Sequence, residues 1–409
     1  KMGILGLPNV GKSSLFNLLT EQSAQAENFP FCTIDPNESR CPVPDQRFKW
    51  LCELWQPASI IPAYLHVTDI AGLIRGASEG AGLGNAFLSH IQAVDGLYHV
   101  IRAFDDPEVV HVDDSVDPIR DLETIMYELC RKDQAYIQGV KERKEAELKR
   151  DPKKKPTPAY YSMMDKVDEM LEANVPLRNG EWSLEDIARI NDIMPQAITL
   201  KPIVYLINID KRSFLRKGNK WFAPINEWVQ SHGGGTIIPF SVAWEQELWH
   251  LRDDPAGREA FLAEANGLKS VLPRIVKVGY NVLNLCYFFT AGEDEVRAWT
   301  IPTGALAPEA AGAIHTDFER GFIKAEVMAY SDFKELATGK SVAPIKAAGK
   351  YRQEGKQYVV QDGDIIHFMF NVTAKKKYAT AKIYFYPSFH GYLLNYVLVF
   401  YGFARVITT

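Results

Sequence analysis

The sequence predicts an α/β fold in which a parallel sheet carries an inserted helical arm and is followed by a smaller β-rich domain. Three observations support this prediction. An apolar strand at the start of the chain runs into a glycine-rich loop and a helix, within residues 1–19. About 80 residues with a helical pattern remain between the strands expected at 63–68 and 201–207, after two strand–helix steps are allowed for. Short strands separated by turns then begin near Leu283.

The composition is that of an ordinary globular protein. The 409 residues contain 46 Lys and Arg against 51 Asp and Glu, a formal net charge of −5, which excludes nucleic-acid binding through bulk charge but leaves room for a local basic patch. Hydrophobic residues make up 46% and charged residues 24%, and at about 150 residues per domain the length predicts two or three domains.

The cysteines are scattered, form no CxxC pair and therefore indicate neither a disulfide framework nor a zinc site. They are Cys32, Cys41, Cys52, Cys130 and Cys286. A reducing compartment fits this pattern best. No signal peptide is visible, although the chain begins directly on a strand and we expect its native start to be missing. We therefore expect a cytoplasmic protein.

Residues 6–13 read GLPNVGKS, which matches the phosphate-loop pattern G-x-x-x-x-G-K-S and lies between a strand and a helix as that motif requires. The glycines let backbone N–H groups turn toward phosphate oxygens at a helix N-terminus, where the helix dipole favours anions. We expect Lys12 to reach the β- and γ-phosphates of a nucleotide and Ser13 to ligate Mg²⁺. The predicted nucleotide-binding residues of this loop are Asn9, Val10, Gly11, Lys12, Ser13 and Ser14.

A second strand-like run, residues 63–68, ends in the sequence DIAG at 69–72, one strand–helix unit after the phosphate loop. We expect Asp69 to hold Mg²⁺ through water and the N–H of Gly72 to contact the γ-phosphate. Between the two motifs, Thr33 is expected to ligate Mg²⁺ and to act as a switch residue that senses the γ-phosphate. The glycine-rich stretch that follows Gly72 favours a nucleotide-dependent switch over a static core.

A third element is the base-reading loop, where the sequence NIDK at 208–211 follows a buried strand. GTPases carry N-K-x-D at this place, and the last carboxylate accepts guanine N1–H and N2–H₂. Here that position is Lys211, which only donates, and the carboxylate of Asp210 lies one residue early. Guanine is therefore disfavoured and adenine is the better ligand, with Lys211 donating to adenine N1 or pointing to solvent. The expected purine contacts are Asn208, Ile209 and, in the loop after a later strand, Ser241, Val242 and Ala243.

The chain resembles the YchF/Obg-like ATPase family of TRAFAC P-loop NTPases over roughly residues 1–372. The strings that carry the resemblance are GLPNVGKS at 6–13, NFPFCTIDPNES at 28–39, DIAGLIRGASEGAGLGNAFLSHI at 69–91 and FTAGEDEVRAWTI at 289–301. The resemblance implies a Ras-like nucleotide domain, a helical insertion and a C-terminal β-grasp (TGS) domain. It also implies a preference for ATP over GTP and a role at the ribosome in translation and stress responses. Family members carry N-x-x-E at the base loop, and this chain has Lys211 at the Glu position.

The residue that orients the attacking water is not the usual one. Many GTPases carry Gln directly after D-x-x-G, but this position, the third expected switch residue, is Leu73, which has no hydrogen-bonding group. The family resemblance points to a histidine on the loop after the next strand, which is His111 here. Lys12 is the second expected catalytic residue. By the same resemblance Phe104 forms an apolar wall beside adenine, with a core aromatic as the alternative.

The inserted segment, residues 116–199, has the pattern of a helical arm. Asp117 followed by Pro118 supplies a helix start, and apolar residues recur at helical spacing over 119–129. We expect this arm to serve partner docking rather than catalysis.

The rest of the arm is expected to turn back on the first helix. The run KERKEAELKRDPKKK at 141–155 is either a solvated helix face that ends in a loop or a contact to ribosomal RNA phosphates. Returning helices are expected near 160–171 and 183–188, the second capped by Ser183 together with Asp186.

The predicted domains are a nucleotide domain at 1–115 and 200–280, the helical insertion at 116–199, a TGS domain at 281–372 and a tail outside the resemblance at 373–409. In the TGS domain, strands are expected near 285–290, 298–301 and 365–370. The longest apolar run of the tail has about 16 residues, which is short for a membrane span, so no membrane partner is expected.

These features predict a Mg²⁺-dependent NTPase that prefers ATP to GTP and acts on the ribosome, through the large subunit or its RNA, as a monomer. Two alternatives remain at this stage. One is a nucleotide-gated ribosome- or RNA-binding switch whose turnover is incidental, which the absence of Gln at Leu73 favours. The other is a conventional GTPase that reads guanine through the shifted Asp210.

Overall fold

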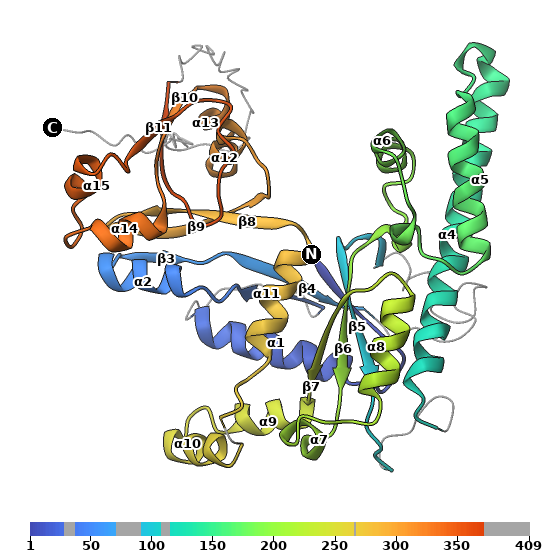
Figure 1. The fold of residues 1–409 in the computed structure, drawn as a ribbon, viewed down its shortest axis with the longest axis horizontal. Helices are drawn as coiled ribbons and strands as arrows, with labels where there is room; N and C mark the ends of the chain where they lie inside the picture. The colour runs from blue at the N-terminus through green and yellow to red at the C-terminus, as the bar shows by residue number, and fades with distance from the viewer. Residues whose placement is uncertain (28–36, 71–90, 108–114, 266, 372–409) are drawn as a thin grey trace, which may run out of the picture. The chain divides into compact units, whose positions relative to one another are not determined.

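The apolar run at the start of the chain forms β1 (Met2–Leu5), a central strand of the first sheet. The computed structural model describes residues 1–27, 37–70, 91–107, 115–265 and 267–371. The six-stranded first sheet has the order β2-β4-β1-β5-β6-β7, and its neighbours are parallel except for β2 and β4 (Figure 1). The other strands are β2 (Glu38–Pro42), β4 (Tyr64–Asp69), β5 (Gly96–Arg102), β6 (Ile203–Asn208) and β7 (Thr236–Phe240).

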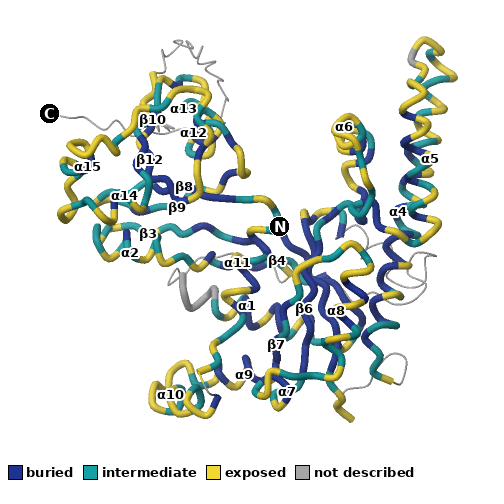
Figure 2. Tube along the Cα trace, in the orientation of Figure 1, coloured by how far each residue is buried: buried dark blue, intermediate teal, exposed yellow. Residues whose placement is uncertain are grey.

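The centre of this sheet is fully covered. Every residue of β5 and of β6 is buried, as expected for the inner strands of a parallel sheet with helices on both faces. Figure 2 shows the contrast with the helices α6 (Leu184–Ile193) and α10 (Pro255–Glu264), which are mostly exposed. The parallel register brings the carboxyl ends of the strands to one edge: Ile4 pairs with Asp69, and Asn208 pairs with Phe240.

The inserted arm begins where the sequence predicts. Asp117 caps α4 (Pro118–Arg150) by accepting hydrogen bonds from Ile119 N at 3.1 Å and Arg120 N at 3.2 Å, with Pro118 in the first turn. The helix is longer than the periodic stretch predicts because Lys, Glu, Arg and Ala, which are good helix formers, carry it on to Arg150.

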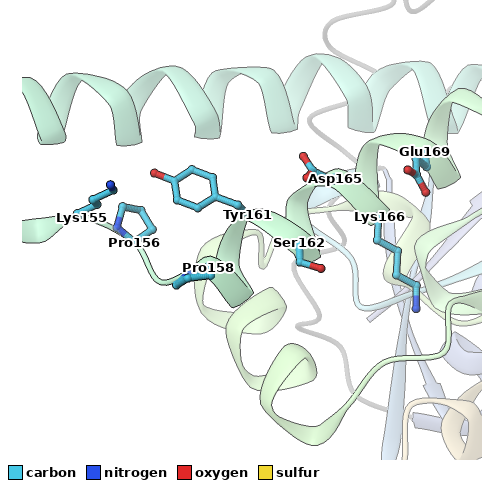
Figure 3. A pocket seen from close by; sticks show the side chains of 8 residues that line it. All are labelled: Lys155, Pro156, Pro158, Tyr161, Ser162, Asp165, Lys166 and Glu169. Atoms are coloured by element: carbon cyan, nitrogen blue, oxygen red, sulfur yellow. The ribbon is translucent and has the colours of Figure 1, made fainter.

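The chain returns along α4 as α5 (Pro158–Glu172), as Figure 1 shows. Lys141 of α4 is paired with Asp168 of α5. Ser183 then caps α6 by accepting from Asp186 N at 3.1 Å, as predicted. A surface groove beside α5, lined by residues from Lys155 to Glu169, mixes two lysines with two carboxylates (Figure 3). This groove therefore carries no excess positive charge.

A buried carboxylate fixes the base of the arm. Asp133 of α4 is fully buried and accepts hydrogen bonds from Ile198 N at 2.8 Å and Thr199 N at 2.7 Å. These amides begin the short 3₁₀ helix η4 (Ile198–Leu200), which leads directly into β6. The other single-turn helices of the arm are η2 (Pro152–Lys154) and η3 (Leu177–Asn179).

Further helices surround the first sheet. They are α1 (Lys12–Glu27), α7 (Lys211–Leu215), α8 (Phe222–Ser231), α9 (Val242–His250) and α11 (Leu272–Val282). The helix α2 (Gln46–Trp55) packs instead against the second sheet, where the ring centroids of Phe48 and Phe289 lie 6.0 Å apart. The hydroxyl of Tyr98 in β5 donates to Ile275 O of α11 at 2.7 Å, which fixes that helix against the sheet.

The C-terminal part builds a second six-stranded sheet, of order β11-β10-β12-β8-β9-β3. Its strands are β8 (Leu285–Ala291), β9 (Glu295–Pro302), β10 (Phe322–Met328), β11 (Arg352–Glu354) and β12 (Ile365–Phe370). Four short helices accompany it: α12 (Ala307–Ile314), α13 (Thr316–Arg320), α14 (Tyr330–Leu336) and α15 (Ala343–Ala347). The strands predicted at 285–290, 298–301 and 365–370 all lie within strands of this sheet.

The sixth strand of the second sheet, β3 (Ser59–Ile61), comes from the N-terminal part of the chain and pairs in parallel with β9. The sequence does not predict this pairing, because a three-residue strand has no detectable periodicity.

Two chemical expectations can be compared with the described residues. Among them, no disulfide joins Cys41, Cys52, Cys130 or Cys286. Within the same residues, no helix combines the length and apolar character needed to cross a membrane.

Candidate nucleotide-binding site

The phosphate loop lies at the carboxyl edge of the first sheet, between β1 and α1. Two residues of the loop have positive φ angles, 61° at Asn9 and 99° at Gly11. Glycine adopts this backbone region readily, and asparagine is enriched there among the other residues. A Cβ atom on Gly11 would lie 2.5 Å from Nδ2 of Asn208, which leaves no room for a side chain. The glycine is therefore required by close contact with the base loop as well as by backbone geometry.

Lys12 is prepared to receive an anion. Its side chain is buried, and Nζ donates to Leu7 O at 2.6 Å within the same loop. Burial lowers the pKa of Lys12 to about 8, while the nearby carboxylate of Asp69 acts in the opposite direction. Negative phosphate oxygens would stabilise an ammonium group in such a buried place, because opposite charges attract each other more strongly where water does not screen them.

Ser13 and Asp69 meet at the neighbouring strand end. Ser13 Oγ donates to Asp69 Oδ2 at 2.9 Å, and Asp69 Oδ1 is buried without a hydrogen-bond partner among the described residues. Burial raises the pKa of Asp69, although the Ser13 hydroxyl and the Lys12 charge act in the other direction. A buried carboxylate oxygen without a partner, next to a hydroxyl, fits the oxygen ligands that Mg²⁺ prefers.

Asn208 joins the base loop to the rest of the site. It is 3% exposed, its Nδ2 donates to Val10 O at 3.0 Å, and its Oδ1 accepts from Val242 N at 3.1 Å. The side-chain amide therefore links the phosphate loop, β6 and the loop after β7. Its role is to hold these three segments together at the sheet edge.

The other predicted purine contacts lie around Asn208. Ser241 is buried and caps α9, its Oγ accepting from Trp244 N at 3.4 Å. Val242 and Ala243 form the first turn of that helix, with Ala243 exposed. The side chain of Ile209 is buried in the core, and its N–H donates to Phe240 O at 2.9 Å.

Both charged residues of the base loop are engaged elsewhere. Asp210 caps α7 by accepting from Ser213 N at 2.8 Å, and although burial acts against it, hydrogen bonds from Ser213 lower the pKa of Asp210. Lys211 is paired with Glu247 of α9, and its Nζ lies 5.0 Å from the ring centroid of Phe261. Lys211 thus contacts a carboxylate that sequence analysis missed, because no local pattern links positions in two separate helices.

Phe104 follows β5 on the same edge of the sheet. Arg102 pairs with Asn208 in the strand register, and its guanidinium carbon lies 4.6 Å from the Phe104 ring centroid. Phe104 is half-buried, and its carbonyl oxygen accepts from Arg102 Nε at 3.2 Å. Four predicted residues, Thr33, Gly72, Leu73 and His111, lie outside the described residues.

A phosphate loop, an acidic residue at the neighbouring strand end and a base loop at one edge of a parallel sheet define a P-loop nucleoside triphosphatase domain. Residues 1–138 match a family model described as a 50S ribosome-binding GTPase. Residues 285–371 match the model of the C-terminal domain of YchF GTPases, which is described as a protein of unknown function.

Known proteins resemble the chain along most of its length. Obg-like ATPase 1 of Oryza sativa subsp. japonica is 55% identical over 377 residues, covering 92% of this chain and 93% of the relative. Obg-like ATPase 1 of Homo sapiens is 52% identical over 379 residues, covering 92% and 94%. The solved YchF GTPase of Schizosaccharomyces pombe is 45% identical, with a TM-score of 0.79 over 90% of this chain and 97% of that one. The chain therefore belongs to the Obg-like ATPase (YchF) family, which confirms the predicted family and fold class.

Proposed function

We propose that the protein is a Mg²⁺-dependent nucleoside triphosphatase that hydrolyses ATP in preference to GTP and works in association with the ribosome. Membership of a P-loop NTPase family implies nucleotide hydrolysis. The choice of ATP rests on the base loop, where the carboxylate of Asp210 caps α7 and Lys211 is paired with Glu247. The fourth position of the loop thus offers guanine no acceptor.

The energetic argument follows from the two bases. Guanine presents N1–H and N2–H₂ donors, and a buried donor left without an acceptor costs about 1–3 kcal/mol. Adenine has an acceptor at N1 and no N2 amine, so main-chain groups are sufficient to bind it. Ala243, the exposed residue in the otherwise buried first turn of α9, would supply such groups at the sheet edge, since the amides of Val242 and Trp244 are already bonded within the protein.

In the proposed reaction, Lys12 and the loop amides stabilise the charge that develops on the transferring phosphoryl group. Ser13, Thr33 and Asp69 would hold Mg²⁺ directly or through water, and the bound ion would neutralise charge on the β- and γ-phosphates. His111 would orient the attacking water, since Leu73 has no group that can do so. The roles of Thr33 and His111 rest on the sequence and the family resemblance.

The ribosome is proposed as the partner because residues 1–138 match the model described as a 50S ribosome-binding GTPase. The arm and the C-terminal domain would provide the contacts, to the large subunit or its RNA. The four described cysteines form no disulfide, which fits a reducing compartment, so we place the protein in the cytoplasm. We propose that it acts there as a monomer.

The primary test is a side-by-side titration of the full chain with ATP and GTP in the presence of Mg²⁺. ATP binding at least tenfold tighter, equal to about 1.4 kcal/mol, is expected. Tighter binding of GTP would overturn the proposed preference and favour the conventional GTPase.

Two variants of Lys211 sharpen this test. Lys211→Asp restores a carboxylate at the guanine-reading position and is expected to raise GTP affinity. Lys211→Ala breaks the pair with Glu247 without adding an acceptor, and GTP affinity should stay low. An equal gain in both variants would show that the lysine charge, rather than a missing acceptor, excludes guanine.

A second candidate function is a nucleotide-gated binding protein whose turnover is incidental, which Leu73 in place of Gln favours. The variant His111→Ala separates the two candidates. If His111 positions water, turnover falls while ATP affinity is retained. An unchanged basal rate would favour the binding switch.

A further inference from the structure

The two sheets share a continuous piece of chain. Strand β3 pairs with β9 in the second sheet, where Ser59 N donates to Asp294 O at 2.9 Å. Only Pro62 and Ala63 separate β3 from β4 of the first sheet. Since β4 ends at Asp69, the segment 59–69 leads without a loop from the second sheet to the proposed metal site.

Arg47 makes a second connection between the same two parts, and we call its bonds to Asp45 and Asp362 the clamp. Arg47 Nη2 lies 2.7 Å from Asp45 Oδ2 and 2.7 Å from Asp362 Oδ2, and Nη1 donates to Asp362 O at 3.1 Å. The hydroxyl of Tyr287 in β8 donates to Asp45 as well. The clamp therefore ties the start of α2 to the turn before β12 and to β8.

The turn is shaped to receive the guanidinium group. Gly363 has a φ of 86°, and a Cβ atom there would lie 2.3 Å from Nη1 of Arg47. The side chain of Asp45 is 6% exposed, while those of Arg47 and Asp362 are 29% and 50% exposed, so the pair with Asp45 is the better sheltered of the two. A bidentate guanidinium contact under these conditions is directional and holds its partners in one geometry.

The clamp is also connected to Asp69 through main-chain hydrogen bonds. Directly before Asp45, Val43 N donates to Ala63 O at 2.8 Å, next to the link between β3 and β4. The preceding strand β2 is antiparallel to β4, and Asp69 N donates to Asn37 O at 3.0 Å at its far end. We call β2 with β4 the ribbon. At the end of the ribbon that faces the second sheet, β4 is connected to that sheet through β3, and β2 is connected to it through the clamp.

We propose that Arg47 is a positioning residue, and that through the clamp and the ribbon the second sheet fixes Asp69 against Ser13 and the phosphate loop. A ligand or partner that moves the C-terminal domain then changes nucleotide binding, and nucleotide changes the affinity for that partner by the same factor. The inference rests on the proposed nucleotide site but not on which base it prefers.

The test compares three variants of the full chain. Arg47→Ala removes the clamp, and Asp362→Ala removes the carboxylate from Nη2 while leaving Arg47 on Asp45 and on the main-chain oxygen of residue 362. Lys340→Ala is the control: it breaks an ion pair with Glu293 beside the same sheet and a contact with the Trp55 ring at the end of α2, and it leaves every bond of the clamp in place. Amide hydrogen exchange is followed in the nucleotide-free protein, and ATP affinity is measured with and without Mg²⁺.

We expect Arg47→Ala and Asp362→Ala to speed exchange in β2 and β4 about tenfold, while the Lys340 variant matches the wild type. Affinity for ATP with Mg²⁺ should fall about fivefold and affinity without Mg²⁺ should hold. Faster exchange confined to α2, β8 and the turn at 361–364 would overturn the proposal and make the clamp a local brace. If the wild type binds neither ATP nor GTP, the proposed function fails. The exchange data would still decide whether loss of the clamp loosens β4.

Discussion

Ser13 and Asp69 lie on neighbouring elements of one sheet edge, and the serine hydroxyl donates to the carboxylate at 2.9 Å. In this arrangement Oδ1 of Asp69 is buried without a partner among the described residues. Because a buried carboxylate oxygen without a partner is costly, the pair suits the Mg²⁺ ion that we propose to bind here with the nucleotide.

Replacing Asp69 by Ala should therefore abolish the gain in ATP affinity that Mg²⁺ provides. We expect binding with Mg²⁺ to weaken about tenfold, at the lower end of the effect of losing an outer-sphere metal contact, and binding with EDTA to stay near the wild-type value. Isothermal titration under both conditions checks this. A variant that keeps the full Mg²⁺ effect would remove Asp69 from the metal site.

Asn208 offers a test of how the site is held together. Its side chain is buried and satisfies both Val10 O and Val242 N. Asn208→Ala leaves both groups unpaired, so ATP binding should weaken by about 2 kcal/mol, or roughly thirtyfold. Asn208→Asp keeps an acceptor for Val242 N but loses the donor to Val10 O. Its ATP affinity should therefore lie between those of the wild type and Asn208→Ala. Equal affinities in all three proteins would contradict the role assigned to this amide.

Asp210 is expected to matter for stability and not for base choice. Asp210→Ala removes the N-cap of α7 and should lower the free energy of unfolding by about 1 kcal/mol. The ratio of ATP to GTP affinity should not change. Denaturation curves and nucleotide titrations on the same preparations check both statements, and a shift in the ratio would revive Asp210 as a base reader.

His99 predicts a specific acid sensitivity. It is buried in β5, and burial, with the charges of Arg178 and Lys12, lowers its pKa from 6.5 to about 3. Below pH 6.5 the unfolded chain therefore binds a proton that the folded chain refuses, and stability is lost as pH falls toward 3 at about 1.4 kcal/mol per pH unit.

The variant His99→Gln isolates this contribution. Between pH 6 and pH 4 the wild type should lose about 1.4 kcal/mol per unit more than the variant in urea denaturation. Parallel pH profiles would mean that His99 takes up its proton in the folded state.

The sequence predicts well those features whose cause lies within a few residues. Caps at Asp117 and Ser183 are confirmed, and the strand predicted at 365–370 coincides with β12. The GLPNVGKS loop also lies between a strand and a helix as predicted. In each case the signal is a hydrogen-bonding side chain, an apolar run or a glycine next to the element that it controls.

Contacts between distant segments could not be predicted in this way. Glu247 as the partner of Lys211, and Asp362 as the partner of Arg47, are ordinary surface-type residues in the sequence. Their selection depends on helices and turns that become neighbours only after the sheets have formed. Asp210 is a local exception, since it caps α7 by accepting from Ser213 N three residues later, but its place in the base-loop pattern directed the prediction toward purine binding.

The membership of β3 in the second sheet also has a consequence for biosynthesis. Ser59 and its partner Glu295 are 236 residues apart, so at about 5–20 residues per second β9 leaves the ribosome roughly 10–50 seconds after β3. During that interval β3 lacks its partner strand, and the aromatic side chains of Phe48 and Trp50 in α2, which contact Phe289 and Phe333 in the finished fold, are open to other chains. Messages truncated before the codons for β9 should therefore yield products that are prone to aggregate.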